Sequence, residues 1–83
     1  MISCEQYDYI EIACMYRFEL IITFISGESI TATAIDTKRN KENQECLVIQ
    51  HASDSALIVL DQIIAIEAVK ANPHFTKITF IHQ

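Results

Sequence analysis

The sequence predicts a mostly β, α+β fold, in which one N-terminal helix precedes a strongly bent antiparallel sheet of five or six strands. Three observations predict it. Apolar residues recur with a helical period over about the first fourteen positions and alternate after that. The connections are short, and no repeat or linker interrupts the 83 residues, so residues 1–83 are expected to form one domain. Because a small sheet needs covered or closed edges, we expect it to bend into a small barrel capped by the helix.

Composition and charge narrow the class of protein. Apolar residues make up 51% of the chain, which is typical of a packed globule rather than a disordered segment. No apolar run approaches the roughly 18 residues that cross a bilayer, and the start MISCEQYD has no feature of a secretion signal. A cytoplasmic protein without membrane contact is therefore expected. The net charge of −5 disfavours direct nucleic-acid binding and favours a basic protein partner.

The first helix is predicted at about 4–14 and is amphipathic. Ser3 and Gln6 have the spacing of a capping box. The apolar face comprises Tyr7, Ile10, Ala13 and Cys14. The acidic face comprises Glu5, Asp8 and Glu11. Ile12 projects among the acids, where it is either a single exposed isoleucine or part of a contact surface.

Alternating or continuous apolar segments follow the helix. They predict strands at about 18–26, 29–36, 45–51, 56–60 and 63–69, with 75–81 as a sixth strand at the edge. The single glycine, Gly27, marks a tight turn, and the polar segment TKRNKENQE (37–45) is expected to be a loop. ALIVL (56–60) is continuously apolar, which predicts burial on both faces of that strand.

Cysteine and histidine are too dispersed to predict a disulfide or a metal site. Cys4 and Cys14 lie about 15 Å apart on one helix, beyond the reach of a disulfide. With Cys46 they make an odd number of cysteines, which indicates reduced thiols. The histidines are equally scattered, at positions 51, 74 and 82. We therefore expect no metal and no other cofactor.

No pattern of catalytic residues is present. A single glycine excludes a phosphate-cradling loop, and there is no G-x-S-x-G elbow. Asp8 and Glu11 would both be solvated on an exposed helix face, so the pair does not indicate acid–base catalysis. The sequence predicts a protein that is not an enzyme.

Three surfaces remain as candidate sites, each with a plainer structural reading. The acidic helix face is either solvated or directed at a basic partner. The segment 37–45 is either a hydrophilic loop or a small basic tip carrying Lys38, Arg39 and Lys41. Tyr7 and Tyr9 are either interface anchors or, for Tyr7 above all, half core.

The N-terminal run I-x-C-x-x-Y-D-x-[IL]-E-[IL]-A-C resembles the opening of the Rho-binding antiterminator family, Rof or YaeO. The residues that carry this pattern are Ile2, Cys4, Tyr7, Asp8, Ile10, Glu11, Ile12, Ala13 and Cys14. The likeness continues in the same order along nearly the whole chain. Its later matches are Gly27 and Glu28, Ala34 and Asp36, Leu47 and Val48, and Leu60, Asp61 and Ile63.

The resemblance implies an Sm-like fold and a non-catalytic function. Proteins of this family bind the hexameric transcription termination factor Rho at the primary RNA-binding site of its N-terminal domain. RNA is then excluded and Rho-dependent termination falls, which is antitermination. On this hypothesis the acidic face replaces phosphate charge, and Tyr9 or Ile12 supplies the apolar contact. In the family the loop between the second and third strands also lies near Rho. In this chain that loop offers Lys41 and Asn43.

The predicted partner-binding residues are thus Glu5, Tyr7, Asp8, Tyr9, Glu11, Ile12, Lys41 and Asn43. A free monomer is expected. Two alternatives stay open: an Sm-like module that binds RNA itself, and an adaptor for another basic protein.

Overall fold

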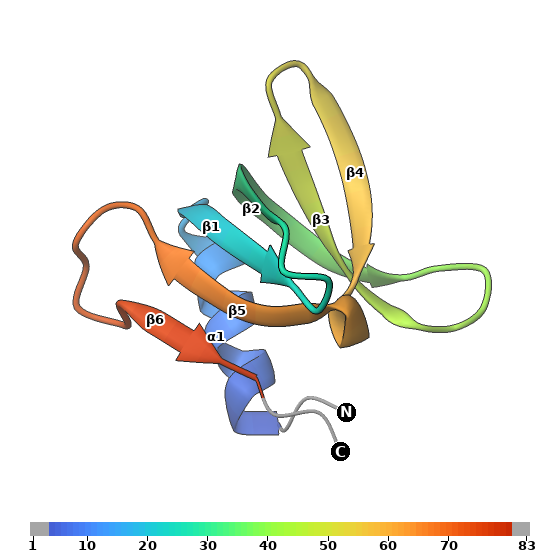
Figure 1. Ribbon diagram of the computed structural model, residues 1–83, viewed down its shortest axis with the longest axis horizontal. Coiled ribbons are helices and arrows are strands. Elements are labelled where there is room, and N and C mark those ends of the chain that lie inside the picture. Colours follow the sequence, from blue (N-terminus) through green and yellow to red (C-terminus); the bar gives the residue numbers. More distant parts are fainter. Residues whose placement is uncertain (1–3, 81–83) are drawn as a thin grey trace.

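The computed structural model describes residues 4–80, in which one helix precedes a six-stranded antiparallel sheet (Figure 1). The elements are α1 (Cys4–Met15), β1 (Glu19–Phe24), β2 (Ser29–Arg39), β3 (Glu45–His51), β4 (Asp54–Val59), η1 (Leu60–Gln62), β5 (Ile63–Ala68) and β6 (Lys77–Thr79). This order confirms the predicted fold class. Ile2, Ser3 and His82, which the sequence also singled out, lie outside the described residues.

The sheet has the strand order β4-β3-β2-β1-β5-β6, so β4 and β6 are its edges. Two irregularities bend it, one at Thr23/Phe24 in the β1–β5 pairing and one at Ala34/Asp36 in the β2–β3 pairing. Within residues 4–80 no pairing joins β4 to β6, so the sheet is open rather than closed into a barrel. The 3-10 turn η1 connects β4 to β5, and the Ile25 N–H just after β1 donates to the Gln62 carbonyl at 2.9 Å.

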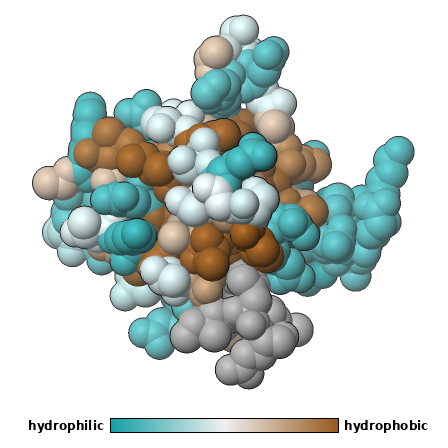
Figure 2. Space-filling model, in the orientation of Figure 1, coloured by the Kyte–Doolittle hydropathy of each residue, from teal (hydrophilic) through white to brown (hydrophobic). Residues whose placement is uncertain are grey.

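One hydrophobic core lies between α1 and the sheet. In the view of Figure 1, α1 lies behind β1 and β5. It contributes Ile10, Ala13 and Cys14 to the core, as its 3.6 period predicts. Leu20 and Ile22 of β1 are fully buried beneath it. Figure 2 shows hydrophobic surface over the middle of the opposite face of the sheet, whereas the β2–β3 loop is hydrophilic.

The C-terminus of α1 is a Schellman motif with an unusual residue at its left-handed position. The Phe18 N–H donates to the Ala13 carbonyl at 2.9 Å, and the Arg17 N–H donates to the Cys14 carbonyl at 3.2 Å. Arg17 has φ of 55°, where glycine is usual. Its side chain offsets that cost, because Nη1 donates to the Ile35 carbonyl at 2.7 Å and ties the helix end to β2.

Two expectations about the strands need correction. β2 extends to Arg39, beyond the expected end at 36, because Lys38 and Arg39 pair with Cys46 and Glu45 of β3. The loop is therefore only 40–44. The predicted burial of ALIVL on both faces is wrong, since β4 is an edge strand and Leu57 is 45% exposed. β4 also begins at Asp54, which pairs with His51, and β6 covers only Lys77–Thr79.

Candidate functional site

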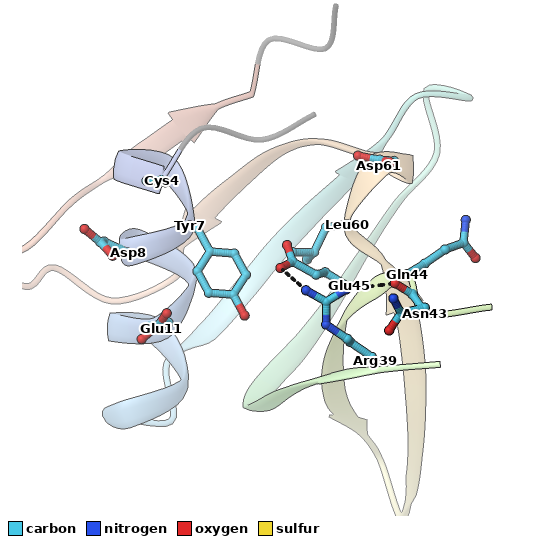
Figure 3. A pocket seen from close by; sticks show the side chains of 10 residues that line it. All are labelled: Cys4, Tyr7, Asp8, Glu11, Arg39, Asn43, Gln44, Glu45, Leu60 and Asp61. Atoms are coloured by element: carbon cyan, nitrogen blue, oxygen red, sulfur yellow. Dashed lines mark hydrogen bonds and ion pairs between the residues drawn. The ribbon is translucent and has the colours of Figure 1, made fainter. Parts of the chain in front are cut away.

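A surface cavity of about 670 Å³ lies between α1, the β2–β3 loop and η1 (Figure 3). It joins segments that are far apart in the sequence. The lining residues are Cys4, Tyr7, Asp8, Glu11, Arg39, Asn43, Gln44, Glu45, Leu60 and Asp61. Four of these ten are carboxylates and one is a cation, so the lining carries a net negative charge.

Helical spacing builds one wall of the cavity. Tyr7 and Glu11 are one turn apart and therefore project from the same side of α1, with Asp8 beside them. Tyr7 is half-buried and packs against the core. Its ring points from α1 toward the Arg39–Glu45 pair on the opposite wall (Figure 3). The carboxylates of Asp8 and Glu11 are exposed, where they remain available to a partner.

Hydrogen bonds hold the opposite wall, the β2–β3 loop, in a defined shape. The Asn40 side-chain oxygen accepts from the N–H groups of Glu42 at 3.0 Å and Gln44 at 2.9 Å. Arg39 donates from Nη1 to the Asn43 carbonyl at 2.9 Å and from Nη2 to Glu45 Oε1 at 3.3 Å. Both side chains of this ion pair are about half exposed, so it adds little stability and breaks easily.

The charge of the lining decides what the cavity can attract. Carboxylates on a rigid helix can form short, charge-assisted hydrogen bonds with arginine or lysine side chains. The Tyr7 ring adds an aromatic surface over which a cation can lie. Among residues 4–80 no group of three or more His, Cys, Asp or Glu side chains is arranged to hold a metal ion. The arrangement is thus suited to a cationic side chain of a partner.

The structure brings four of the predicted site residues together in this cavity: Tyr7, Asp8, Glu11 and Asn43. The other four do not line it. Glu5 and Lys41 are exposed, and Ile12 is half-buried. Tyr9 lies against the core, with its ring 5.7 Å edge-on from that of Phe75, so little of it is left for a partner.

Sequence reasoning assigned no partner-binding role to six of the ten lining residues, Cys4 among them. Arg39 was interpreted as part of a loop tip, and Gln44 and Glu45 had no assigned role. Leu60 and Asp61 appeared only as a match in the resemblance. Their place in the cavity depends on the β2–β3 pairing and on η1, and no local pattern reveals that these segments meet α1.

The cysteines are free thiols. Cys4 is exposed at the cavity, whereas Cys14 and Cys46 are buried. Burial raises the pKa of the Cys14 thiol to about 11, with Asp36 and Glu11 adding to the rise and Arg17 opposing it. Cys14 is therefore neutral at physiological pH and is not an activated nucleophile.

Fold and site together define a small α+β protein whose candidate site is a negatively charged surface cavity. No helix among residues 4–80 has both the length and the apolar character needed to cross a membrane.

The family described as "Modulator of Rho-dependent transcription termination (ROF)" matches residues 1–80. Two curated relatives, both called "Protein rof", come from Escherichia coli (strain K12) and Shigella flexneri. Each is 36% identical over 62 residues, which is 75% of this chain and 73% of the relative. A solved structure described as "YaeO bound to Magnesium from Vibrio cholerae O395" is similar, with a TM-score of 0.85 and 39% identity. That match covers 92% of this chain and 99% of the other.

The chain belongs to the Rof/YaeO family of modulators of Rho-dependent transcription termination. This confirms the resemblance carried by the N-terminal motif. The family description is that of a regulator and names no catalytic activity.

Proposed function

We propose that this protein inhibits Rho by occupying the primary RNA-binding site on the N-terminal domain of the Rho hexamer. RNA is excluded from that site, so Rho-dependent termination falls. The protein performs no catalysis and acts in the cytoplasm, where transcription takes place. The observation that carries the proposal is the negatively charged cavity that Asp8 and Glu11 of α1 line together with residues of the β2–β3 loop.

The chemistry of an RNA site explains why carboxylates would compete for it. Such a site carries arginine and lysine for phosphates and a platform for bases. Asp8 and Glu11 replace phosphate charge within the cavity, and Glu5 extends the same helix face toward the partner. Tyr7 provides the aromatic surface at the centre of the contact.

The β2–β3 loop forms the second half of the proposed contact. Asn43 lines the cavity, and Lys41 stands exposed in the same turn, where it can reach an acidic or polar group of Rho. Ile12 adds apolar contact at the outer side of α1. Tyr9 contributes its hydroxyl edge, because its ring is used in packing against Phe75.

The test follows labelled pyrimidine-rich RNA bound to Rho by fluorescence anisotropy while the protein is added. We expect the anisotropy to fall as RNA is released, and less protein to be needed at low salt than at high salt. The control is the same RNA without Rho. RNA that stays on Rho would contradict the proposal, and RNA that binds this protein alone would favour the RNA-binding alternative.

A pair of double variants assigns the surface. Asp8→Asn with Glu11→Gln should require at least tenfold more protein for the same release, because the cavity loses two carboxylates. Glu19→Gln with Glu28→Gln removes the same charge from exposed positions outside the cavity and should behave like the native chain. Equally weakened release by both double variants would show that net charge, not α1, is responsible, and native release by both would exclude the two α1 carboxylates from the contact.

A further inference from the structure

The chain itself places one cation inside the negatively charged cavity. Arg39, at the end of β2, lines the cavity together with Tyr7 and Glu45. Figure 3 shows the Arg39 guanidinium beside the Glu45 carboxylate, on the wall toward which the Tyr7 ring points. A guanidinium is the group that this lining is suited to bind, because carboxylates pair with it and an aromatic face attracts it. The cavity is therefore partly filled by the kind of side chain that we expect a partner to insert.

The hydrogen bonds of the Arg39 guanidinium go to its own wall of the cavity. Nη1 donates to the Asn43 carbonyl at 2.9 Å, and Nη2 donates to Glu45 Oε1 at 3.3 Å. Arg39 and Glu45 are partners in the β2–β3 register, so strand pairing keeps the two side chains adjacent. Neither Asp8 nor Glu11 forms an ion pair with a residue between 4 and 80. The α1 carboxylates thus stay open to a partner, whereas Glu45 is neutralised from within the chain.

The Arg39–Glu45 pair is weak enough to be exchanged for another ion pair. Its side chains are 56% and 47% exposed, so water screens the attraction between them. Its length of 3.3 Å exceeds the separation of about 2.7–2.9 Å in a strong charge-assisted hydrogen bond. A second cation that enters the cavity repels the first, because like charges beside one carboxylate disfavour each other. The entering cation and Arg39 therefore compete for Glu45.

We propose that Arg39 is an internal competitor for Glu45. When the chain binds Rho, an arginine or lysine side chain of the Rho RNA site pairs with Glu45, and the Arg39 guanidinium leaves that carboxylate for solvent. Arg39 thereby weakens binding and favours partner sites whose cation reaches far enough to displace it. The inference rests on the proposed function, because that function supplies the cation. The contrary role, in which Arg39 strengthens binding by holding the β2–β3 loop in shape, predicts that loss of Arg39 weakens binding.

Two methionine variants measure the sign of the Arg39 effect. Arg39→Met keeps the length of the side chain but removes its charge and its donors. Lys38→Met removes the same charge from the neighbouring exposed position, which does not line the cavity. In the assay of RNA release from Rho, Arg39→Met should need about three- to tenfold less protein than the native chain, because Glu45 is open before binding. Lys38→Met should differ from the native chain by less than about twofold.

Two results would overturn the inference while the native chain still releases RNA, which separates it from the proposed function. Unchanged or weaker release by Arg39→Met would show that Arg39 does not compete, and weaker release would assign it to holding the loop. An equal gain from Arg39→Met and Lys38→Met would show that the total charge of the chain is responsible.

A double-mutant cycle tests whether Glu45 is the shared carboxylate. Glu45→Gln should weaken RNA release only slightly in the native background, where Arg39 occupies the carboxylate. In the Arg39→Met background the same change should weaken release by about threefold or more. Equal losses in the two backgrounds would mean that Arg39 and the Rho cation do not share Glu45, which would overturn the inference.

A measurement without Rho tests the competition independently of the proposed function. The probe is N-acetylargininamide, which carries one guanidinium, and its binding is followed through the backbone amide NMR signals of Tyr7 and Glu45. We expect Arg39→Met to bind this probe about threefold more tightly than the native chain, and Lys38→Met to match the native chain. Equal affinities of the native chain and Arg39→Met would overturn the competition, whatever the action on Rho.

Discussion

The side-chain amide of Gln6 donates a 3.0 Å hydrogen bond to the backbone carbonyl of Thr79, 73 residues later in the chain. This contact links the first turns of α1 to the last strand of the sheet. It also covers the edge of β6, the shortest strand of the sheet, which has only three residues. The helix that carries the proposed binding face therefore also secures the C-terminal end of the fold.

Replacing Gln6 should loosen β6 selectively. Gln6→Glu keeps the side-chain shape but removes the donor, so we expect a loss of about 1 kcal/mol in the free energy of unfolding. Backbone amides of β5 and β6 that pair with each other should exchange faster with deuterium, while those of β3 keep their native rates. Uniform acceleration across the sheet would show that Gln6 does not act through this edge.

The apolar face of α1 should determine most of its contribution to stability. Ile10 is fully buried, so Ile10→Ala should cost about 2–5 kcal/mol through lost burial and the cavity left behind. Ile12→Ala, at a half-buried position on the same helix, removes the same atoms and should cost far less. Urea unfolding of both variants measures the difference, and equal losses would mean that the helix does not pack as described.

Local periodicity was sufficient to predict α1 and most of the sheet. The 3.6 spacing of Ile10, Ala13 and Cys14 is what a helix packed on one side requires, and these residues are buried. Local periodicity failed to predict the structure where strand pairing overrides the preference of the local sequence. Lys38 and Arg39 are in β2 because β3 provides hydrogen-bonding partners, although their charges are typical of a loop.

For the same reason, only four of the ten residues that line the candidate site were predicted from the sequence. Asp8 and Glu11 share a helix, so their common face follows from spacing alone. Glu45 and Asp61 come from the start of β3 and from η1, and they meet α1 only because the sheet bends. The burial of ALIVL (56–60) likewise depends on topology. Its strand lies at the edge of the sheet and has one neighbouring strand, which leaves Leu57 partly exposed.

Asn40 should control the shape of the β2–β3 loop. Asn40→Ala removes the oxygen that accepts from the N–H groups of Glu42 and Gln44, whereas Asn40→Asp retains it. Because the loop is exposed, we expect the free energy of unfolding to change by about 1 kcal/mol or less in either variant. Release of RNA from Rho should nevertheless be weaker for Asn40→Ala than for Asn40→Asp. Native release by Asn40→Ala, with its loop amides exchanging faster, would exclude the loop from the contact.

Cys14 should make the fold sensitive to alkaline pH. Its thiol pKa is about 11 in the folded protein against a reference value of 9.0, because burial disfavours the thiolate. Below pH 9 the thiol is protonated in both states and contributes no pH dependence. Between pH 9 and about 11 the unfolded chain loses this proton while the folded chain retains it, so the free energy of unfolding falls, by up to about 2–3 kcal/mol. Urea unfolding at pH 8, 9 and 10 measures the slope. Cys14→Ala lowers stability at every pH but should flatten that slope, and an unchanged slope would assign the alkaline loss to other groups.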